Sequence, residues 1–195
     1  MHLVDALRRL TPEMAAWRHD IHRHPETAYE AHRTSALVAT ELERLGIEVH
    51  RGLGTTGLVG VLRAGTANRA VGLRADMDAL NLTELNDFDY CSVNEGKMHA
   101  CGHDGHTAML LGAAQYLAHD PGFDGTVYFI FQPAEEGGHG AKAMIDDGLF
   151  ERFPCESVFG LHNMPGFEVG TFAVRKGPIL ASADNDGLGG LRLDA

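Results

Sequence analysis

Five residues at three separate points of the chain could together bind a divalent metal and activate water. Cys101 and His103 are two positions apart, Glu135 and Glu136 are adjacent, and His162 follows a later apolar run. A thiol, two imidazoles and two carboxylates offer the sulfur, nitrogen and oxygen donors that transition metals bind. Of two adjacent carboxylates, one can bind metal as an anion while the other moves protons. The set therefore predicts a metal-dependent hydrolase.

Each of these residues alone also has an ordinary structural explanation. The cysteine could be a small buried hydrophobe beside a surface histidine, and the glutamate pair could begin a solvated helix. A lone histidine at the end of an apolar strand is commonly a hydrogen-bonded core residue. All five, however, lie at the ends of predicted elements, and as one constellation they favour metal binding. The mixed donor set suits zinc, manganese, cobalt or nickel better than calcium or magnesium.

Two further carboxylates and a group of histidines accompany this set. Asp76 and Asp78 leave the end of another predicted strand, and we interpret them as partners that orient a histidine ligand rather than as turn-forming acids. His19, His22 and His24 lie near a predicted helix end, where cations are favoured, so we expect surface or capping roles for them.

Alternating helices and strands must position these residues. The patterns predict a helix starting at the cap Thr11-Pro12 and ending before Pro25. Strands 57–63 and 70–75 are predicted to form a hairpin through the turn 65–68. A polar loop is expected over 80–98, and 126–131 is apolar enough to be a central strand covered on both faces. The remaining predicted helices are 30–45, 104–117 and 139–147, and the remaining strands are 47–50 and 157–162.

This alternation indicates an α/β/α sandwich with a mixed, mostly parallel sheet, in which sites form where strands end. We expect a catalytic metal-binding domain over 1–184 and an aberrant or disordered glycine-rich tail over 185–195. With 27 acidic and 16 basic residues, the net charge of −11 opposes binding to nucleic acid or anionic membranes. Three cysteines, an odd number, and the lack of a signal-like apolar run favour a reduced, cytoplasmic protein.

Several motifs together resemble the M20 metallopeptidase family, in the branch that includes hippurate hydrolases, N-acyl-amino-acid hydrolases and plant auxin-conjugate hydrolases. The resemblance runs in order from about Met14 to Asp184. It is carried by Arg-His-Pro-Glu at 23–26, Leu-Arg-Ala-Asp-Met-Asp-Ala-Leu at 73–80, the Cys101 motif at 98–106, Phe-Gln-Pro-Ala-Glu-Glu-Gly at 131–137 and Gly-Leu-His-Asn at 160–163.

The resemblance implies a role for each candidate. Cys101, His103, Glu136 and His162 match metal ligands of a site for two ions, manganese or zinc. Glu135 matches the general base and Asp78 an acid that supports the site, while the role of Asp76 is less defined. The implied reaction is hydrolysis of the amide bond of an N-acyl amino acid by metal-activated water. Full-length relatives are expected to be homo-oligomers.

Part of the family pattern is not found in this sequence. Family members continue into a lid or dimerisation domain and then supply a final histidine ligand, neither of which is found in this sequence. We therefore expect a truncated chain with weak metal binding and little or no amidase activity of its own. The alternatives are an M20-type dipeptidase, a non-catalytic metal-binding remnant, and a plain α/β domain whose Cys and His are structural.

Overall fold

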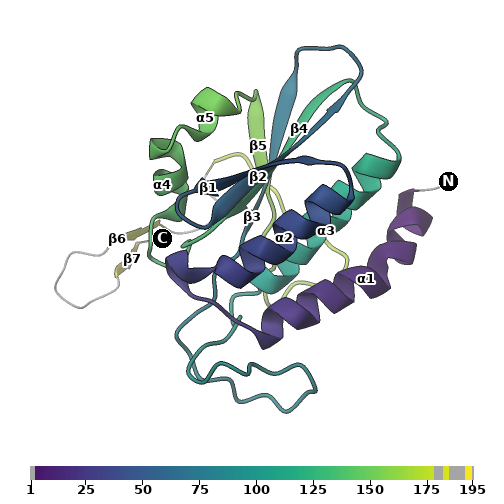
Figure 1. Cartoon of the computed structure of the whole chain (residues 1–195). Helices are drawn as coiled ribbons and strands as arrows, with labels where there is room; N and C mark the ends of the chain where they lie inside the picture. The colour runs from purple at the N-terminus through teal and green to yellow at the C-terminus, as the bar shows by residue number, and fades with distance from the viewer. Residues whose placement is uncertain (1–2, 178–181, 185–191, 195) are drawn as a thin grey trace. The chain divides into compact units, whose positions relative to one another are not determined.

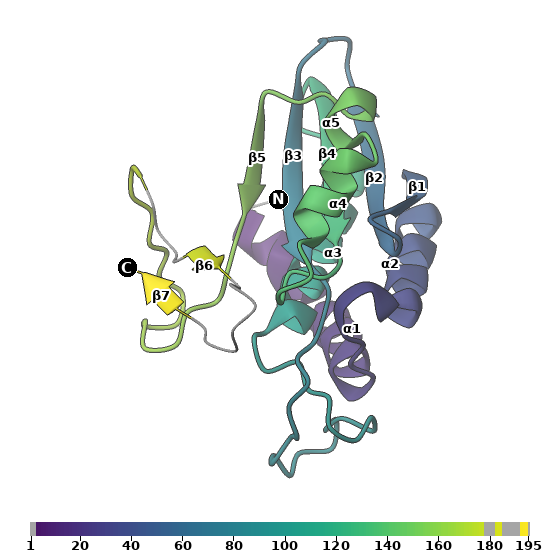
Figure 2. The same ribbon diagram turned by 90° about the vertical axis from the view of Figure 1, so that its left-hand side faces the viewer.

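The computed structural model describes residues 3–177, 182–184 and 192–194, and its main feature is a five-stranded sheet with helices on both faces (Figures 1 and 2). The strand order is β1-β2-β4-β3-β5. The strands are β1 (Glu48–Leu53), β2 (Gly57–Ala64), β3 (Ala70–Asp76), β4 (Gly125–Gln132) and β5 (Ser157–Gly160). The helices are α1 (Leu3–Arg23), the 3-10 turn η1 (Ala28–Glu30), α2 (His32–Arg44), α3 (His103–His119), α4 (Gly140–Asp146) and α5 (Leu149–Arg152).

The chain divides into two compact units, 1–162 and 163–195. The first contains the whole five-stranded sheet. In the second, the described residues include the antiparallel pair β6 (Ser182–Asp184) and β7 (Arg192–Asp194). The tail predicted over 185–195 lies outside the described residues except for β7. Within the part of the chain that the structure describes, no helix combines the length and apolar character needed to cross a membrane.

Strand β4 shows why the sheet is covered on both faces. Phe129 and Phe131 are fully buried in one core cluster with α1, α2 and α3, whereas Tyr128 and Ile130 point into a second cluster with α4 and α5. Successive side chains of a strand alternate between faces, so an all-apolar strand needs cover on both. This confirms the predicted α/β/α sandwich. The sheet is mixed, with parallel β3–β4 and β3–β5 pairs and antiparallel β1–β2 and β2–β4 pairs.

The predicted hairpin of β2 and β3 is wrong, because β4 lies between these two strands. The turn does reverse the chain, but β3 pairs in parallel with β4 through the long crossover that contains α3. Asp124, just before β4, accepts hydrogen bonds from the backbone N–H groups of Thr66 and Ala67 at 2.6 and 2.7 Å. The observed hairpin is β1–β2. Local turn residues predict a reversal of the chain, not its pairing partner.

The predicted helix start at Thr11-Pro12 is also wrong, since α1 runs continuously from Leu3 through Pro12. Thr11 is therefore no cap; its hydroxyl donates a hydrogen bond to the backbone oxygen of Leu7 at 3.3 Å. A proline inside a helix costs about 3 kcal/mol. Burial of Trp17 and Ile21 against the rest of the core offsets that cost. The helices predicted over 30–45, 104–117 and 139–147 agree with α2, α3 and α4 within a few residues.

Candidate metal centre

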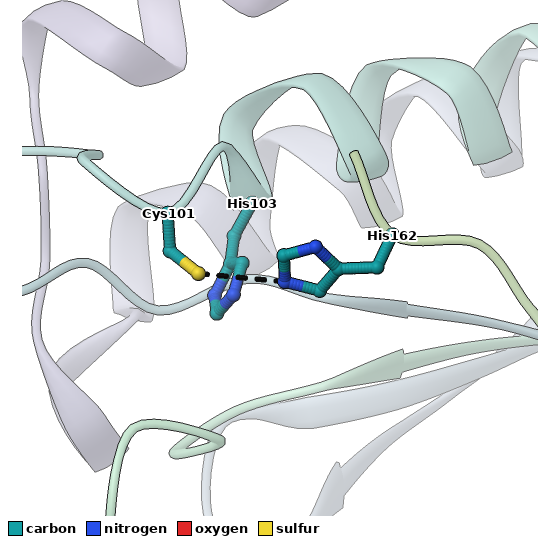
Figure 3. A group of neighbouring side chains, drawn as sticks. All are labelled: Cys101, His103 and His162. Atoms are coloured by element: carbon teal, nitrogen blue, oxygen red, sulfur yellow. Dashed lines mark hydrogen bonds between the residues drawn. The ribbon is translucent and has the colours of Figure 1, made fainter. Parts of the chain in front are cut away.

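The candidate ligands gather where three parallel strands end. β3, β4 and β5 run in the same direction side by side, so their carboxyl ends meet at one edge of the sheet. Asp76 ends β3, the glutamate pair follows β4, and His162 follows β5. The loop before α3 supplies Cys101, and the first residue of α3 supplies His103, to the same place (Figure 3). The structure thus brings together the residues that the sequence predicted as one site.

His103 is the first residue of α3, and its ring is completely buried. Its Nδ1 lies 2.8 Å from the backbone oxygen of Asp78, an acceptor, so Nδ1 carries the proton and donates it. Among the described residues, Nε2 has no hydrogen-bond partner. It lies 3.6 Å from Asp76 Oδ2 and 3.8 Å from the nearest carboxylate oxygens of Glu135 and Glu136. Burial lowers the pKa of His103, but the nearby carboxylates of Asp78, Asp76 and Glu136 outweigh it and raise the pKa above its ordinary value. A histidine held in this way directs its Nε2 into the site.

Cys101 and His162 complete one side of the cluster. Gly102, between the cysteine and His103, has a φ of 92°, a left-handed conformation that glycine adopts without steric cost. That turn lets Cys101 approach His103, and Cys101 Sγ lies 3.4 Å from His162 Nε2 (Figure 3). Burial and a hydrogen bond with Glu136 raise the pKa of the Cys101 thiol to about 12. Only a nearby cation would make the thiolate favourable at neutral pH.

The two glutamates are held by their backbone. Their N–H groups donate to the two carboxylate oxygens of Asp78, at 2.8 Å for Glu135 and 3.0 Å for Glu136. Gly137 has a φ of 78°, and a Cβ added to Gly138 would lie 2.6 Å from Ala134 Cβ. The backbone at this glycine pair therefore approaches Ala134 more closely than a residue with a side chain would allow. Burial, with Glu136 beside it, raises the pKa of Glu135 above its ordinary value.

Asp76 is held by His106 and Arg74, two residues for which the sequence predicted no role. His106 is buried and lies with Nδ1 2.6 Å from Asp76 Oδ1, and Arg74 donates to Asp76 Oδ2 at 2.7 Å. Burial opposes the negative charge of Asp76, but these partners outweigh it and lower its pKa. Helical spacing gives a signal for His106, because it is three residues after His103 and shares its helix face. The ring centroid of His106 is 4.6 Å from that of His162.

The donors present fit a divalent transition metal. Three sets each bring one ligand atom per residue within 4.8 Å of one another: Cys101–His103–His162, His103–Glu135–Glu136 and Asp76–His103–His106. In the part of the chain that the structure describes, His103 Nε2 and Glu136 Oε1 are buried polar atoms without a hydrogen-bond partner, and both face the same cluster. Leaving such atoms unpartnered is costly, and a metal ion would satisfy both.

The predicted surface or capping role is wrong for His22. Its side chain is only 4% exposed, and it lies between the carboxylates of Asp104 and Glu84. The prediction used only the position of His22 near the end of a helix. In the fold, α1 packs this face against α3 and the 80–98 loop, so His22 is buried. His22 is not one of the residues grouped around His103.

The chain is similar to known proteins over most of its length. Residues 72–185 match the family described as Peptidase family M20/M25/M40. Hippurate hydrolase of Campylobacter jejuni is 49% identical over 185 residues, which cover 95% of this chain and 48% of that protein. IAA-amino acid hydrolase ILR1-like 4 of Arabidopsis thaliana is 46% identical over 171 residues, covering 87% of this chain and 38% of that protein.

A solved structure has the same fold. The YXEP protein of Bacillus subtilis, described as a dinuclear metal binding peptidase from the M20 family, superimposes with a TM-score of 0.85 and 35% identity. The superposition covers 90% of this chain and 49% of that protein. The chain thus spans about half the length, or less, of these relatives.

Proposed function

The chain belongs to peptidase family M20/M25/M40, and on that premise we propose that it is the metal-binding part of an amidohydrolase that cleaves N-acyl amino acids. One observation carries the proposal: two buried ligand atoms, His103 Nε2 and Glu136 Oε1, lie 3.8 Å apart and have no hydrogen-bond partner within the residues that the structure describes. The names of two relatives, a hippurate hydrolase and an IAA-amino acid hydrolase, support an acyl amino acid as substrate.

Cys101, His103, Glu136 and His162 are the residues that would hold the metal. One sulfur, two nitrogens and one carboxylate suit zinc or manganese, and cobalt or nickel also fit the set. The dinuclear description of the Bacillus subtilis protein supports two ions in a complete site. Bound divalent metal would lower the pKa of water and polarise the amide carbonyl.

Glu135 is assigned as the general base. Its side chain is 41% exposed, so it reaches both the cluster and the solvent from which water arrives. Its raised pKa brings the carboxylate closer to the range in which it can accept a proton and later release it. In this role Glu135 takes a proton from the attacking water and returns it to the leaving amine.

Asp78 supports the site without facing the substrate. It is 1% exposed and links three candidates at once, through its carboxylate to Glu135 and Glu136 and through its backbone oxygen to His103. A group that orients ligands in this way fixes their geometry before substrate binds. We also assign the protein to the cytoplasm, which its three free cysteines support.

Hydrolysis with and without metal tests the proposal. The 1–195 chain is incubated with hippurate and related N-acyl amino acids, and the released amino acid is quantified. We expect little turnover from this chain, and the turnover that is present should be abolished by a chelator, restored by added manganese or zinc, and absent from His103→Ala. Turnover that persists after chelation and in His103→Ala would contradict the proposal, and so would a chain that binds neither metal.

A further inference from the structure

A second buried histidine cluster lies beside the candidate metal centre and has no part in the proposed chemistry. We call His22, Glu84 and Asp104 the His22 cluster. His22 Nδ1 lies 2.9 Å from Asp104 Oδ2, and its Nε2 lies 3.0 Å from Glu84 Oε1. All three side chains are at most 5% exposed. Both ring nitrogens are therefore at hydrogen-bond distance from carboxylate oxygens, out of contact with bulk water.

This geometry determines the charge of His22. A neutral imidazole has a single N–H. The lone pair of its other nitrogen would then face a lone pair of a carboxylate oxygen, which is repulsive. Both carboxylates are also served by other donors: Glu84 accepts from the backbone N–H of Ser92, and Asp104 accepts from Arg18. They are therefore ionised, and His22 donates from both nitrogens as an imidazolium. The hydrogen bond with Asp104 and that with Glu84 raise the pKa of His22 despite its burial.

The His22 cluster joins three segments that are distant in the sequence. His22 belongs to the last turn of α1, Glu84 to the loop between β3 and α3, and Asp104 to the first turn of α3. Asp104 follows His103 directly. The first turn of α3 is consequently held on two sides, by the His103 ring on the backbone of Asp78 and by the Asp104 carboxylate on α1.

We propose that His22 is a positioning residue for the metal centre. As a cation between two carboxylates, it fixes the first turn of α3 against α1 and the 84–92 segment, and so holds His103 where its free nitrogen meets the other ligands. The N-cap residue of α3 is Gly102, which has no side chain and so makes no cap hydrogen bond to this turn. Besides the hydrogen bond of His103 to the Asp78 backbone, the anchor for this turn comes from α1. The inference rests on the proposed metal centre.

The test is a cobalt titration of the 1–195 chain and its variants, followed by the ultraviolet absorption of the cobalt–thiolate bond at Cys101. His22→Gln keeps one hydrogen bond but loses the charge and the second donor. Glu84→Gln is the milder variant, which keeps a hydrogen-bond acceptor for His22.

His119→Gln is the matched control: it makes the same change at the other end of α3, where the Nδ1 of His119 lies 2.7 Å from the backbone oxygen of Gln115. Val38→Ala, in α2, controls for a general loss of stability.

We expect His22→Gln to weaken cobalt binding about 10- to 100-fold, the range found when partners of metal ligands are lost. Glu84→Gln should show a smaller loss in the same direction, and both controls should bind like the unaltered chain when all variants are folded by circular dichroism. Equal affinity in His22→Gln and the unaltered chain would overturn the positioning role, as would an equal loss in Val38→Ala. If His22→Gln does not fold, Glu84→Gln decides by the same criteria. Failure of the unaltered chain to bind cobalt would overturn the metal centre itself and this proposal with it.

Discussion

The rings of His103 and His22 are both buried among carboxylates beside the first turn of α3, yet their hydrogen bonding differs. Each nitrogen of His22 has a carboxylate partner within 3.0 Å. Among the residues with described positions, His103 has one hydrogen-bond partner, a backbone oxygen, and its Nε2 faces carboxylate oxygens at 3.6 to 3.8 Å, beyond hydrogen-bond distance. The difference distinguishes support from function. A completed set of hydrogen bonds holds helices together, whereas a buried histidine with one free nitrogen is prepared to bind a metal.

The largest effect that tests this comparison is on turnover. Glu135→Gln should lower metal-dependent hydrolysis by about 10²- to 10⁴-fold, because the base that accepts the proton from water is removed. The metal content of the purified variant, measured by mass spectrometry, should remain that of the unaltered chain. Loss of metal instead would mean that Glu135 is a ligand and that the roles of the two glutamates are exchanged.

The next effect is on metal affinity. His103→Ala removes a metal ligand, so its affinity for cobalt or zinc should fall by more than about 100-fold. That figure is the upper end of the loss expected when a residue that only supports a ligand is removed. Competition with a chelating dye measures this directly. The His22→Gln variant provides the comparison: if it lost as much affinity as His103→Ala, the distinction between support and ligand would fail.

The third effect is on the pH dependence of metal binding. Without metal, the Cys101 thiol has a pKa raised to about 12, so binding must displace its proton. Below that pKa, affinity should rise by about tenfold per pH unit through this proton alone. Titrations at several pH values around neutrality should show this slope, and Cys101→Ser should make it shallower by one proton. A slope unchanged by Cys101→Ser would exclude the thiolate as a ligand.

The smallest expected effect is on the free energy of unfolding, from a substitution of Glu26, which is not part of the metal centre or the His22 cluster. Glu26 accepts hydrogen bonds from the backbone N–H groups of Arg33 and Thr34 and so caps α2 from outside the helix. Glu26→Ala should lower the free energy of unfolding by about 1 kcal/mol, as loss of a cap does, and leave metal affinity unchanged. Urea unfolding measures the first quantity. Glu30→Ala, which removes only an exposed ion pair with Lys97, is the control and should change stability very little. If Glu26→Ala weakened metal binding, the sensitivity of the site would not be specific to the His22 cluster.

The sequence predicted those features that depend on local pattern. The all-apolar run at 126–131 identified a strand covered on both faces, and the positions of Cys101, Glu135 and His162 at element ends predicted their convergence. Features that depend on distant partners were missed. Nothing near Gly65 reveals that β4 separates β2 from β3. Likewise, the partners of His22 are 62 and 82 residues away, so its burial followed only from the packed fold.

We claim that Cys101 and His103 bind one metal ion together. X-ray absorption of the chain loaded with one equivalent of zinc tests this claim. We predict a sulfur neighbour at about 2.3 Å together with imidazole nitrogens at about 2.0 Å. The sulfur contribution should disappear in Cys101→Ser and remain in His22→Gln loaded to saturation. A zinc ion surrounded only by oxygen and nitrogen in the unaltered chain would contradict the claim.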